Sequence, residues 1–495
     1  MKKHIILLHP LGKEMLVNHQ TALIDVLHEY GIEFPCGGKG TCGKCRVRLL
    51  EGEIKTTENH QQKIEKLSLD ADWRLACFSE CTSDITLEID QFNHLILADE
   101  SEFDFSPQVG FGVAVDLGTT TLVAQLIDLS SAKVLAVESM LNPQIRFGAD
   151  LISRIQACID GKAEEMTRLI RASIGEMIEL MLKKNDVQLE KVLLVGNTVM
   201  QHIYSNIDVS PLSMYPFYTS QVGLQTFDRE ELNWNFRVNQ KVQFYPSIGS
   251  FVGSDILAGI VATGLHKKST YSALIDLGTN GEIVIGNKHQ IVCASTAAGP
   301  AFEGANISMG MRAVTGAISS LCLNEGKIEA SMIGNTSAKG ICGSALIDAV
   351  AILRKLDLIG LFGEINSGEK QIHIAGKISL SQKDINEFQL AKAAIAAGLA
   401  ILSNKLEIQI SDIQEIYIAG GFGSYINIEN VVATGMIELP EEKIHKMGNA
   451  ALIGAKMFLF EDSIITDEIL SKTTHVNLEG DPNFQDIYMD KMMFS

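Results

Sequence analysis

The chain has 495 residues, with 41 lysines and arginines against 60 aspartates and glutamates, so its formal net charge is −19 at pH 7. This length exceeds what one hydrophobic core can organise and predicts roughly two to four domains. The acidic balance argues against nucleic acid or an anionic membrane as a partner. The apolar run at residues 5–8 is too short for a signal peptide, and the alanine-rich segment 391–402 is too short for a membrane span of about 20 residues. We therefore expect a cytoplasmic protein with no membrane partner.

Short apolar runs separated by turns occupy the N-terminal part of the chain, at residues 5–8, 45–50 and 85–89. This alternation is typical of a small β-rich domain. Five of the nine cysteines lie in the same region, and the odd total argues against a disulfide framework. Clustered cysteines of this kind are more often metal ligands. The remaining four lie in apolar segments and are typical of buried small side chains: Cys158, Cys293, Cys322 and Cys342.

Four of the clustered cysteines, Cys36, Cys42, Cys45 and Cys77, have the spacing Cys-x5-Cys-x2-Cys-x31-Cys. A glycine-rich loop around the first three can wrap a cluster closely and point backbone N–H groups at its sulfurs. A structural zinc site favours two separated Cys-x2-Cys pairs, and Cys77 has no such partner. The pattern resembles [2Fe-2S] ferredoxins of the plant and adrenodoxin types, which implies a β-grasp domain with a [2Fe-2S] cluster on these four thiolates. Cys81 is the alternative fourth ligand, although the Arg-Leu-Ala-Cys run ending at Cys77 resembles those ferredoxins more.

After this region the organisation of the chain changes. An acidic segment broken by a proline and a glycine, residues 95–110, predicts a linker. Strands then alternate with a long helical region at residues 150–184, and the helical segments include residues 163–184, 344–358 and 386–406. This order is typical of an α/β fold in which helices cover the faces of a sheet.

An apolar strand followed by Asp-Leu-Gly-Thr occurs twice, at residues 113–119 and 273–279. Each copy runs into a second apolar strand, so each predicts a hairpin with a tight glycine turn. The repetition indicates an internal duplication and therefore two similar lobes. The expected cluster domain, linker, lobe I and lobe II span residues 1–94, 95–110, 111–267 and 268–495.

Two such turns that face each other can bind a phosphate tail. Their glycines let backbone N–H donors approach, their hydroxyls add donors, and their aspartates can hold a hydrated Mg²⁺. A third element, residues 416–424, is an apolar strand that runs into glycines on which adenosine could lie. The predicted MgATP-binding residues are Asp116, Gly118, Thr119, Thr120, Asp276, Gly278, Thr279, Asn280, Gly420, Gly421 and Phe422. The chain has no Gly-x4-Gly-Lys-Ser/Thr run, which excludes a P-loop ATPase.

These three elements, in this order, resemble the superfamily of acetate and sugar kinases, heat-shock chaperone ATPases and actin. The resemblance covers the chain from residue 111 and implies two ribonuclease-H-like lobes with ATP in the cleft between them. It implies that Glu303 reaches the ribose. Residues 339–344 either pack near the base or supply a helix N-cap at Ser344.

The catalytic residues expected in this site are Asp276, Glu282 and Asn197. Asp276 is placed for the metal ion. The residue that positions the attacking water is left open among Glu282, Asn197 and Asp255, because each lies at or just before the boundary of a predicted element.

A ferredoxin domain fused to such an ATPase resembles the reductive activators of corrinoid enzymes. Segments 142–150, 276–282 and 419–423 all look like members of that family. The resemblance implies that one electron passes from the cluster to a Co(II) corrinoid protein, at the expense of ATP, and restores the methyl-accepting Co(I) form. It also implies an unidentified electron donor and a homodimer.

The chain departs from the family in two respects. It is short for the [2Fe-2S] members, which argues against a separate middle domain, and it lacks the C-terminal cysteine clusters of the [4Fe-4S] members. We therefore expect a single cluster. Two other classes stay open on the sequence: a redox-sensing switch or scaffold without a corrinoid partner, and a kinase with an appended redox domain.

Overall fold

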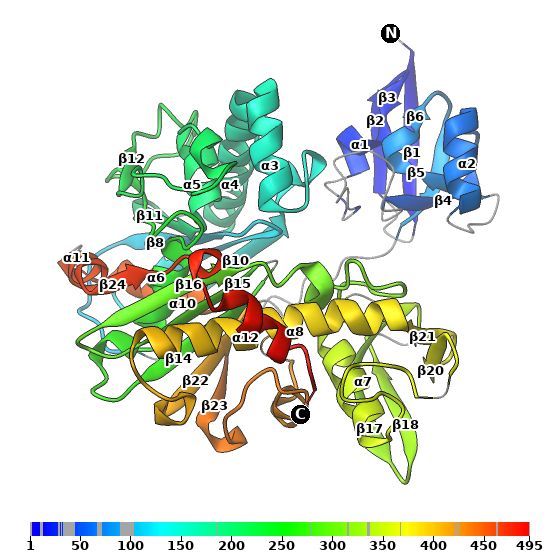
Figure 1. The fold of residues 1–495 in the computed structure, drawn as a ribbon. Helices are drawn as coiled ribbons and strands as arrows, with labels where there is room; N and C mark the ends of the chain where they lie inside the picture. Colours follow the sequence, from blue (N-terminus) through cyan, green and yellow to red (C-terminus); the bar gives the residue numbers. More distant parts are fainter. Residues whose placement is uncertain are drawn as a thin grey trace.

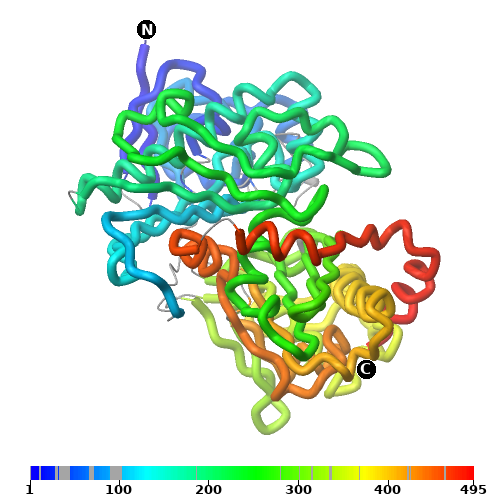
Figure 2. Tube along the Cα trace, turned by 90° about the vertical axis from the view of Figure 1, so that its left-hand side faces the viewer, coloured from blue at the N-terminus to red at the C-terminus, as the bar shows by residue number. Residues whose placement is uncertain are grey.

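The structure is a computed structural model and contains an N-terminal domain and two larger lobes (Figure 1). It describes residues 2–494 except 10–12, 28–29, 31, 33–44, 67–71, 90–102, 186, 279, 314–315, 334–336, 367, 421–422, 424 and 462–463. Figure 2 shows lobe I, in cyan to green, above lobe II, in green to red.

The N-terminal domain is a five-stranded mixed sheet of order β2-β1-β7-β4-β5. Strand β1 pairs antiparallel with the edge strand β2 and parallel with the central strand β7. Alternate residues of β1, including Ile6 and Leu8, are fully buried, as the period of a half-buried strand requires. A sheet of this order with two short helices confirms the expected ferredoxin fold. The elements are β1 Lys3–His9, β2 Lys13–Asn18, β3 Thr21–Ala22, α1 Leu23–Leu27, β4 Arg46–Glu51, α2 Glu58–Lys66, β5 Trp73–Leu75, β6 Glu80–Cys81 and β7 Ile85–Glu88.

The two lobes share a sheet of five corresponding strands, as the duplicated sequence predicted, and differ in the edge at which a sixth strand is added. Lobe I has the order β10-β9-β8-β11-β13-β12, and lobe II has β23-β22-β14-β15-β16-β24. In each lobe three antiparallel strands follow one another along the chain, and the first of them also pairs in parallel with a later strand. Lobe I contains β8 Phe111–Leu117, β9 Thr121–Asp128, β10 Lys133–Leu141, β11 Leu189–Gly196, β12 Gln225–Phe227 and β13 Val242–Phe244. Lobe II contains β14 Ser272–Leu277, β15 Gly281–Gly286, β16 Ile291–Thr296, β22 Glu415–Ala419, β23 Ile444–Gly448 and β24 Thr473–His475.

Helices cover both sheets, and α6 and α10 cross where the lobes meet. At this crossing a Cβ on Gly454 would lie 2.0 Å from the carbonyl oxygen of Ala258, so the two helices approach to backbone contact. One buried apolar cluster continues through both lobes and includes Ala114, Leu274 and Ala455. The helices are α3 Leu151–Ala157, α4 Ala163–Asn185, α5 Thr198–Ser205, α6 Ser254–Ala262, α7 Gly343–Lys355, α8 Gln382–Lys405, α9 Ile428–Ala433, α10 Ala450–Phe458, α11 Ile464–Ser471 and α12 Phe484–Asp490.

Two helix predictions were wrong in detail. The helical region expected over residues 150–184 is α3 and α4, divided at Gly161, whose φ of 86° is left-handed. The helical segment expected over residues 163–184 is confirmed as α4. Helix α8 begins at Gln382 rather than 386, because Ser381 and Asp384 form a capping box that extends the helix into a polar stretch. The proposed N-cap at Ser344 is also wrong: Cys342 is the N-cap of α7, and the Ser344 hydroxyl donates to the Ser319 carbonyl at 2.7 Å.

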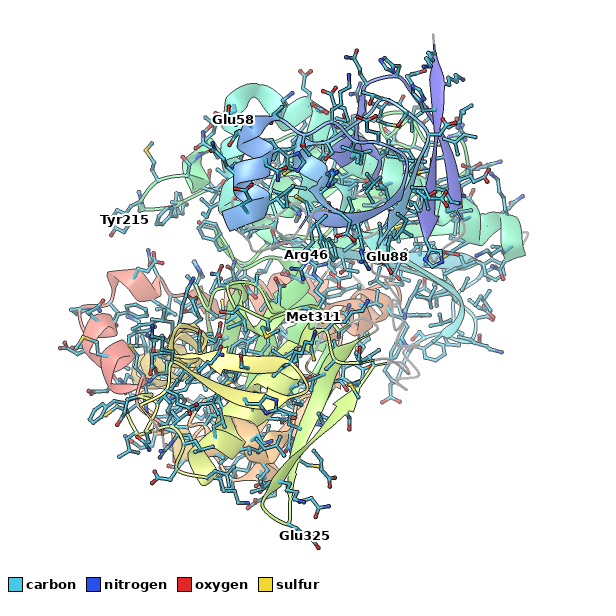
Figure 3. The ribbon with its side chains drawn as sticks, turned by 90° about the vertical axis from the view of Figure 1, so that its right-hand side faces the viewer. Arg46, Glu58, Glu88, Tyr215, Met311 and Glu325 are labelled. Carbon is cyan, nitrogen blue, oxygen red and sulfur yellow. The ribbon has the colours of Figure 1, made fainter. Side chains whose placement is uncertain are left out.

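Lobe II also contains two small sheets outside its main sheet, of order β18-β17-β19 and β20-β21. The strands β17 Ala317–Asn324 and β18 Lys327–Met332 form a long hairpin with Glu325 at its tip, and the same lobe contains β19 Gly340–Ile341, β20 Gln371–Ala375 and β21 Ile378–Ser381 (Figure 3). Helix α8 is long and apolar enough to cross a membrane, but 78% of its most apolar window is buried inside the protein. Its alanines pack on β15 and β16, as expected for a core helix.

Candidate functional site

The predicted phosphate-binding turns close the hairpins β8–β9 and β14–β15. In the first turn the Gly118 N–H donates to the Thr121 carbonyl at 3.1 Å, and in the second the Gly278 N–H donates to the Asn280 carbonyl at 3.0 Å. A Cβ on Gly118 would lie 2.7 Å from the Thr121 oxygen, so this turn requires glycine. The remaining N–H groups of each turn are at the ends of strands, where they can point at an anion.

Asn142 and Arg154 hold the first turn from behind, and sequence reasoning did not single them out. The Asn142 backbone N–H donates to the Thr120 carbonyl and its side-chain amide to the Gly118 carbonyl, both at 2.8 Å. The buried Arg154 guanidinium donates to the Thr119 carbonyl and, at 3.0 Å, to the Gly148 carbonyl. Burial lowers the pKa of Arg154 to about 9. Asn142 begins the segment 142–150 that resembles the family, but its contact with the first turn, like that of Arg154, spans too long a stretch of sequence for a local pattern to reveal.

Asn197 lies beside the first turn, where β11 ends. Its side-chain oxygen accepts from the Met200 N–H and caps α5, while its amide donates to the Thr119 hydroxyl at 3.0 Å. A Cβ on Gly253 would lie 2.4 Å from the Asn197 Cα, so the start of α6 packs directly against this residue. Asp255 is therefore brought close to the same turn.

Four half-buried carboxylates, contributed by both lobes, interact around the turns: Asp116, Asp255, Asp276 and Glu282. Burial raises the pKa of Asp116 to about 6. A hydrogen bond from the Asn449 amide of lobe II, at 2.7 Å, acts in the opposite direction and lowers it. Burial and then the charge of Asp116 raise the pKa of Asp276 to about 7. For Asp255, burial and the charges of Asp276 and Asp116 raise the pKa to about 8.

Glu282 is the neighbour of Asp276 across β14–β15, and the Ser295 hydroxyl donates to it at 3.1 Å. Burial and the charges of Asp255 and Asp276 raise its pKa well above its usual value. Mutual repulsion of this kind favours a bound cation. Among the described residues, however, no group of three or more potential ligands converges closely enough to bind a metal ion directly. Carboxylates of this kind can hold a hydrated cation without converging on it directly.

The third nucleotide element follows β22, which pairs Ala419 with Asp276. Gly420 has a φ of 102°, and a Cβ there would lie 2.3 Å from the Leu277 carbonyl oxygen and 2.9 Å from the Asp276 carboxylate. Only glycine fits here, at a point directly above the second turn. Glu303 is half-buried at the end of the one-turn helix η7 Pro300–Glu303. The other predicted residues of this site, Thr279, Gly421 and Phe422, lie outside the described residues.

Two of the four predicted cluster ligands are described, and their sulfurs converge. The Cys45 and Cys77 Sγ atoms are 3.2 Å apart, close to the separation of about 3.7 Å for two thiolates on one tetrahedral metal ion. Cys45 precedes β4, and Cys77 lies in the one-turn helix η2 Ala76–Phe78. The Ala76 N–H donates to the Cys45 carbonyl at 2.8 Å and fixes the two segments together. The described thiols thus fit an iron–sulfur cluster; Cys36 and Cys42 lie outside the described residues.

Cys81, the alternative ligand, has a different environment. It is fully buried in β6, and its thiol donates to the Ser83 carbonyl at 3.2 Å. Burial raises its pKa, which disfavours the thiolate that a metal needs. The geometry therefore supports Cys77.

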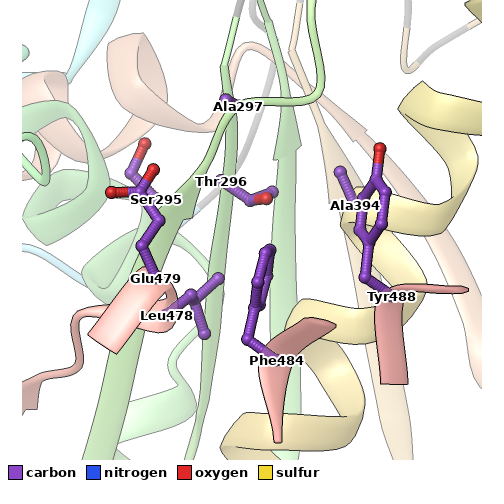
Figure 4. A pocket seen from close by; sticks show the side chains of 8 residues that line it. All are labelled: Ser295, Thr296, Ala297, Ala394, Leu478, Glu479, Phe484 and Tyr488. Carbon is purple, nitrogen blue, oxygen red and sulfur yellow. The ribbon is translucent and has the colours of Figure 1, made fainter. Parts of the chain in front are cut away.

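A cavity of about 200 Å³ lies beside Ser295, between the end of β16 and the C-terminal helices (Figure 4). It is lined by Ser295, Thr296, Ala297, Ala394, Leu478, Glu479, Phe484 and Tyr488. None of the predicted nucleotide residues lines it, and it is smaller than the roughly 300–1,000 Å³ of common small-molecule sites. Among the described residues, Ser295 is the link between this cavity and the carboxylates, through its hydrogen bond to Glu282.

A ferredoxin domain followed by two ribonuclease-H-like lobes with facing phosphate turns defines a ferredoxin-linked ATPase of the actin-like superfamily. Residues 8–82 match the family "2Fe-2S iron-sulfur cluster binding domain", residues 111–268 match "RACo middle region", and residues 270–495 match "C-terminal domain of RACo the ASKHA domain". The part of the chain that matches the family's middle region folds here as lobe I.

The chain belongs to the RACo family of reductive activators of corrinoid proteins. It is 32% identical to the corrinoid activation enzyme RamQ of Eubacterium limosum, with 98% of each chain covered. It is 26% identical to the [Co(II) methylated amine-specific corrinoid protein] reductase of Methanosarcina barkeri, covering 78% of this chain and 77% of that one. A solved structure of a reductive activator for corrinoid, iron-sulfur protein is 28% identical and has a TM-score of 0.68, with 99% and 98% of the chains covered.

The raised pKa values of the carboxylates predict how stability depends on pH without nucleotide or divalent cations. Asp116, Asp276 and Asp255 titrate near 6, 7 and 8 in the folded state but near 3.8 when unfolded, so the folded state binds more protons between these values. The stabilisation is complete below the unfolded pKa and is lost as pH rises through 6 to 8. We expect the free energy of unfolding in urea with EDTA to fall between pH 6.5 and 8.

Asp276→Asn should flatten this decline, and saturating MgADP should suppress it. The window lies above the titration of His202, whose pKa is lowered to about 4, so that histidine does not contribute. Stability that is constant or rises with pH in this window would contradict the carboxylate coupling.

Proposed function

We propose that this protein is an ATP-dependent reductive activator that passes one electron from a [2Fe-2S] cluster to a Co(II) corrinoid protein and restores its Co(I) form. The observation that carries the proposal is the similarity to a corrinoid activation enzyme over 98% of both chains, which includes the ferredoxin domain and both lobes. A match to either half alone would leave the coupling of the two activities unexplained.

We assign the cluster to Cys36, Cys42, Cys45 and Cys77. When bound, the cluster supplies a one-electron carrier with a potential near −400 mV if it is of the plant ferredoxin type. The convergence of Cys45 and Cys77 supports this ligand set, because η2 and the start of β4 bring the two thiols together.

ATP is needed because an acceptor of lower potential stays oxidised without another source of free energy. For one electron, each step of about 59 mV uphill costs a factor of ten in the equilibrium constant. Nucleotide binding that closes the lobes, or hydrolysis, can supply this energy. The crossing of α6 and α10 is where such a closure would be accommodated, since it joins the lobes at backbone contact.

We place the nucleotide phosphates between the two turns, with Asp116 and Asp276 oriented towards a hydrated Mg²⁺. The turn residues Gly118, Thr119, Thr120, Gly278, Thr279 and Asn280 donate to the phosphates. Gly420, Gly421 and Phe422 support the adenosine, and Glu303 reaches the ribose. The contact of Gly420 with Asp276 supports this arrangement, because it brings the base-binding element next to the metal-binding one.

Glu282 and Asn197 are the proposed groups that orient the attacking water, one on each lobe. The raised pKa of Glu282 suits a proton acceptor in this position. The Asn197 amide donates to the Thr119 hydroxyl, which supports a role for it beside the phosphate. Asp255 can assist from the start of α6.

The partner is a corrinoid protein, as the names of the relatives indicate for those proteins. The electron donor, the homodimer and the cytoplasmic location stay predictions.

The test is the conversion of Co(II) to Co(I) in candidate corrinoid proteins, followed by visible absorbance under anaerobic conditions with and without MgATP. The reduced protein should convert its partner only when MgATP is present. Cluster assembly and ATP binding without any response from a corrinoid protein would favour a redox-sensing switch, and a phosphorylated product would favour a kinase.

A further inference from the structure

The ferredoxin domain contacts lobe I through an ion pair between Asp25 and Arg146. Asp25 lies in α1, and its carboxylate is 3.9 Å from the guanidinium of Arg146. Arg146 also pairs with Glu165 of lobe I at 2.6 Å, and its guanidinium lies over the Phe147 ring, 4.9 Å from the centroid. Contacts within lobe I thus hold the Arg146 guanidinium in a position where it can pair with Asp25 of the ferredoxin domain. Figure 1 shows α1 on the side of this domain that faces α3 of lobe I.

On lobe I, Arg146 belongs to the segment that holds the first phosphate turn. It ends the one-turn helix η3 Pro143–Arg146, whose N-cap is Asn142. The Asn142 side chain accepts from the Gln144 N–H at 3.0 Å and donates to the Gly118 carbonyl at 2.8 Å. One residue therefore joins the turn to the helix, and a shift of the turn must move η3.

On the ferredoxin side, α1 is joined to the cluster in the same way. The Leu23 N–H, at the start of α1, donates to the Ser79 carbonyl at 2.9 Å, and the Ser79 N–H donates to the Ala76 carbonyl at 3.2 Å. These bonds attach α1 to η2, which carries Cys77. The Asp25–Arg146 pair is the link between the two halves of a continuous path from Cys77 to Gly118.

We propose that the surface around Arg146 is the docking site for the chain's own ferredoxin domain, and that phosphate in the first turn changes the strength of this docking. The turn carbonyls bond Asn142, and their hydrogen bonds polarise when the neighbouring N–H groups bind an anion. A weak contact suffices because the two domains are tethered. The inference deepens the proposed function, on which it rests for the role of ATP, but it requires no corrinoid protein.

The test is hydrogen exchange of the holoprotein, read at residues 23–27 and 143–146, with and without MgADP. Asp25→Asn should lower protection of both segments about two- to five-fold, the range of an exposed ion pair, and Arg146→Gln should do so at residues 23–27. Residues 143–146 are compared in Asp25→Asn alone, because Arg146→Gln also removes the pair with Glu165 within lobe I. At residues 23–27 the double variant should lose no more protection than either single variant, because each substitution alone already breaks the pair. Raising the salt concentration should have the same effect on the unmodified protein, because the pair is solvent-exposed.

MgADP should change protection of residues 23–27 in the unmodified protein and not in Asp25→Asn. The matched control is Glu14→Gln, an exposed carboxylate on β2 of the same domain, which should behave like the unmodified protein. Cluster absorbance must be unchanged in all variants. Protection that is insensitive to both substitutions and to salt overturns the docking site, and protection insensitive to MgADP overturns the coupling. If hydrogen exchange follows the expected pattern but the unmodified protein reduces no corrinoid protein, the proposed function is contradicted and the docking proposal is not.

Discussion

Replacing Cys77 with serine is expected to remove the [2Fe-2S] cluster and, with it, all ATP-dependent reduction of a corrinoid protein. Serine keeps the shape of the side chain but not the thiolate that binds iron. Cys45 and Cys77 have sulfurs 3.2 Å apart, so the remaining three thiolates cannot close the coordination. We expect reduction to fall by about 100-fold or more, a loss larger than that for removal of an outer-shell partner. Visible absorbance, bound iron and the rate of Co(I) formation measure the effect.

Two controls separate a ligand from a structural cysteine. Cys81→Ser should keep the cluster, because that thiol bonds the Ser83 carbonyl and lies in the core. The expectation that Cys322 is buried was wrong, because it alternates with the buried Leu321 along β17 and is exposed; Cys158 is half-buried, and Cys293 and Cys342 are buried as expected. Cys322→Ser should therefore change nothing. MgADP affinity should also be unchanged in Cys77→Ser. A cluster that persists in Cys77→Ser and is lost in Cys81→Ser would reverse the assignment of the fourth ligand.

Asp276→Asn is expected to lower the rate of ATP hydrolysis by about 10²–10³-fold, because it removes a charge that holds the metal ion on the phosphates. The same substitution should raise the melting temperature of the nucleotide-free protein at pH 8. Asp276 is repelled by Asp116 and raises the pKa of both Asp255 and Glu282, so its removal relieves a buried repulsion. Loss of activity with a gain of stability distinguishes a functional carboxylate from a structural one.

Asp348→Asn is the matched control in the same lobe. Asp348 is also buried with a raised pKa, but it accepts hydrogen bonds from the Leu321 N–H at 2.9 Å and the Asn430 amide at 2.7 Å. An amide cannot accept both bonds equally, so stability should fall while ATP hydrolysis is retained. If Asp276→Asn hydrolyses ATP at the normal rate, the metal-binding role of Asp276 is wrong. If it lowers the apo melting temperature as Asp348→Asn does, its carboxylate is structural.

The sequence predicted the parts of this protein that depend on local patterns. Alternating apolar residues and the repeated Asp-Leu-Gly-Thr turn predicted the hairpins β8–β9 and β14–β15, and these two hairpins have the expected antiparallel register. Two helix boundaries were predicted wrongly. Gly161 divides the helical region 150–184, and the capping box formed by Ser381 and Asp384 starts α8 four residues before the predicted start. In each case one or two residues set the boundary of a helix, although the surrounding apolar pattern has the period of a helix.

The candidate site could be predicted only in part. Asn142 and Arg154 hold the first turn across 24 and 35 residues, and Asn449 bonds Asp116 across 333. A buried arginine or an asparagine cap has no distinctive pattern in sequence, since its role depends on which carbonyl or carboxylate lies opposite. The packing of segments that are far apart in the sequence determines which group that is.

The sequence by itself determined the cysteine spacing, the duplication and the two phosphate turns, because the cluster and the phosphate tail each constrain residues that are close together in the chain. The tertiary structure decided which carboxylates interact, that Cys77 rather than Cys81 faces Cys45, and that the ferredoxin domain meets lobe I at Arg146. Burial and charge repulsion arise only when strands and helices from both lobes surround the same point, so the raised pKa values of Asp255 and Asp276 belong to the fold and not to any segment of the chain.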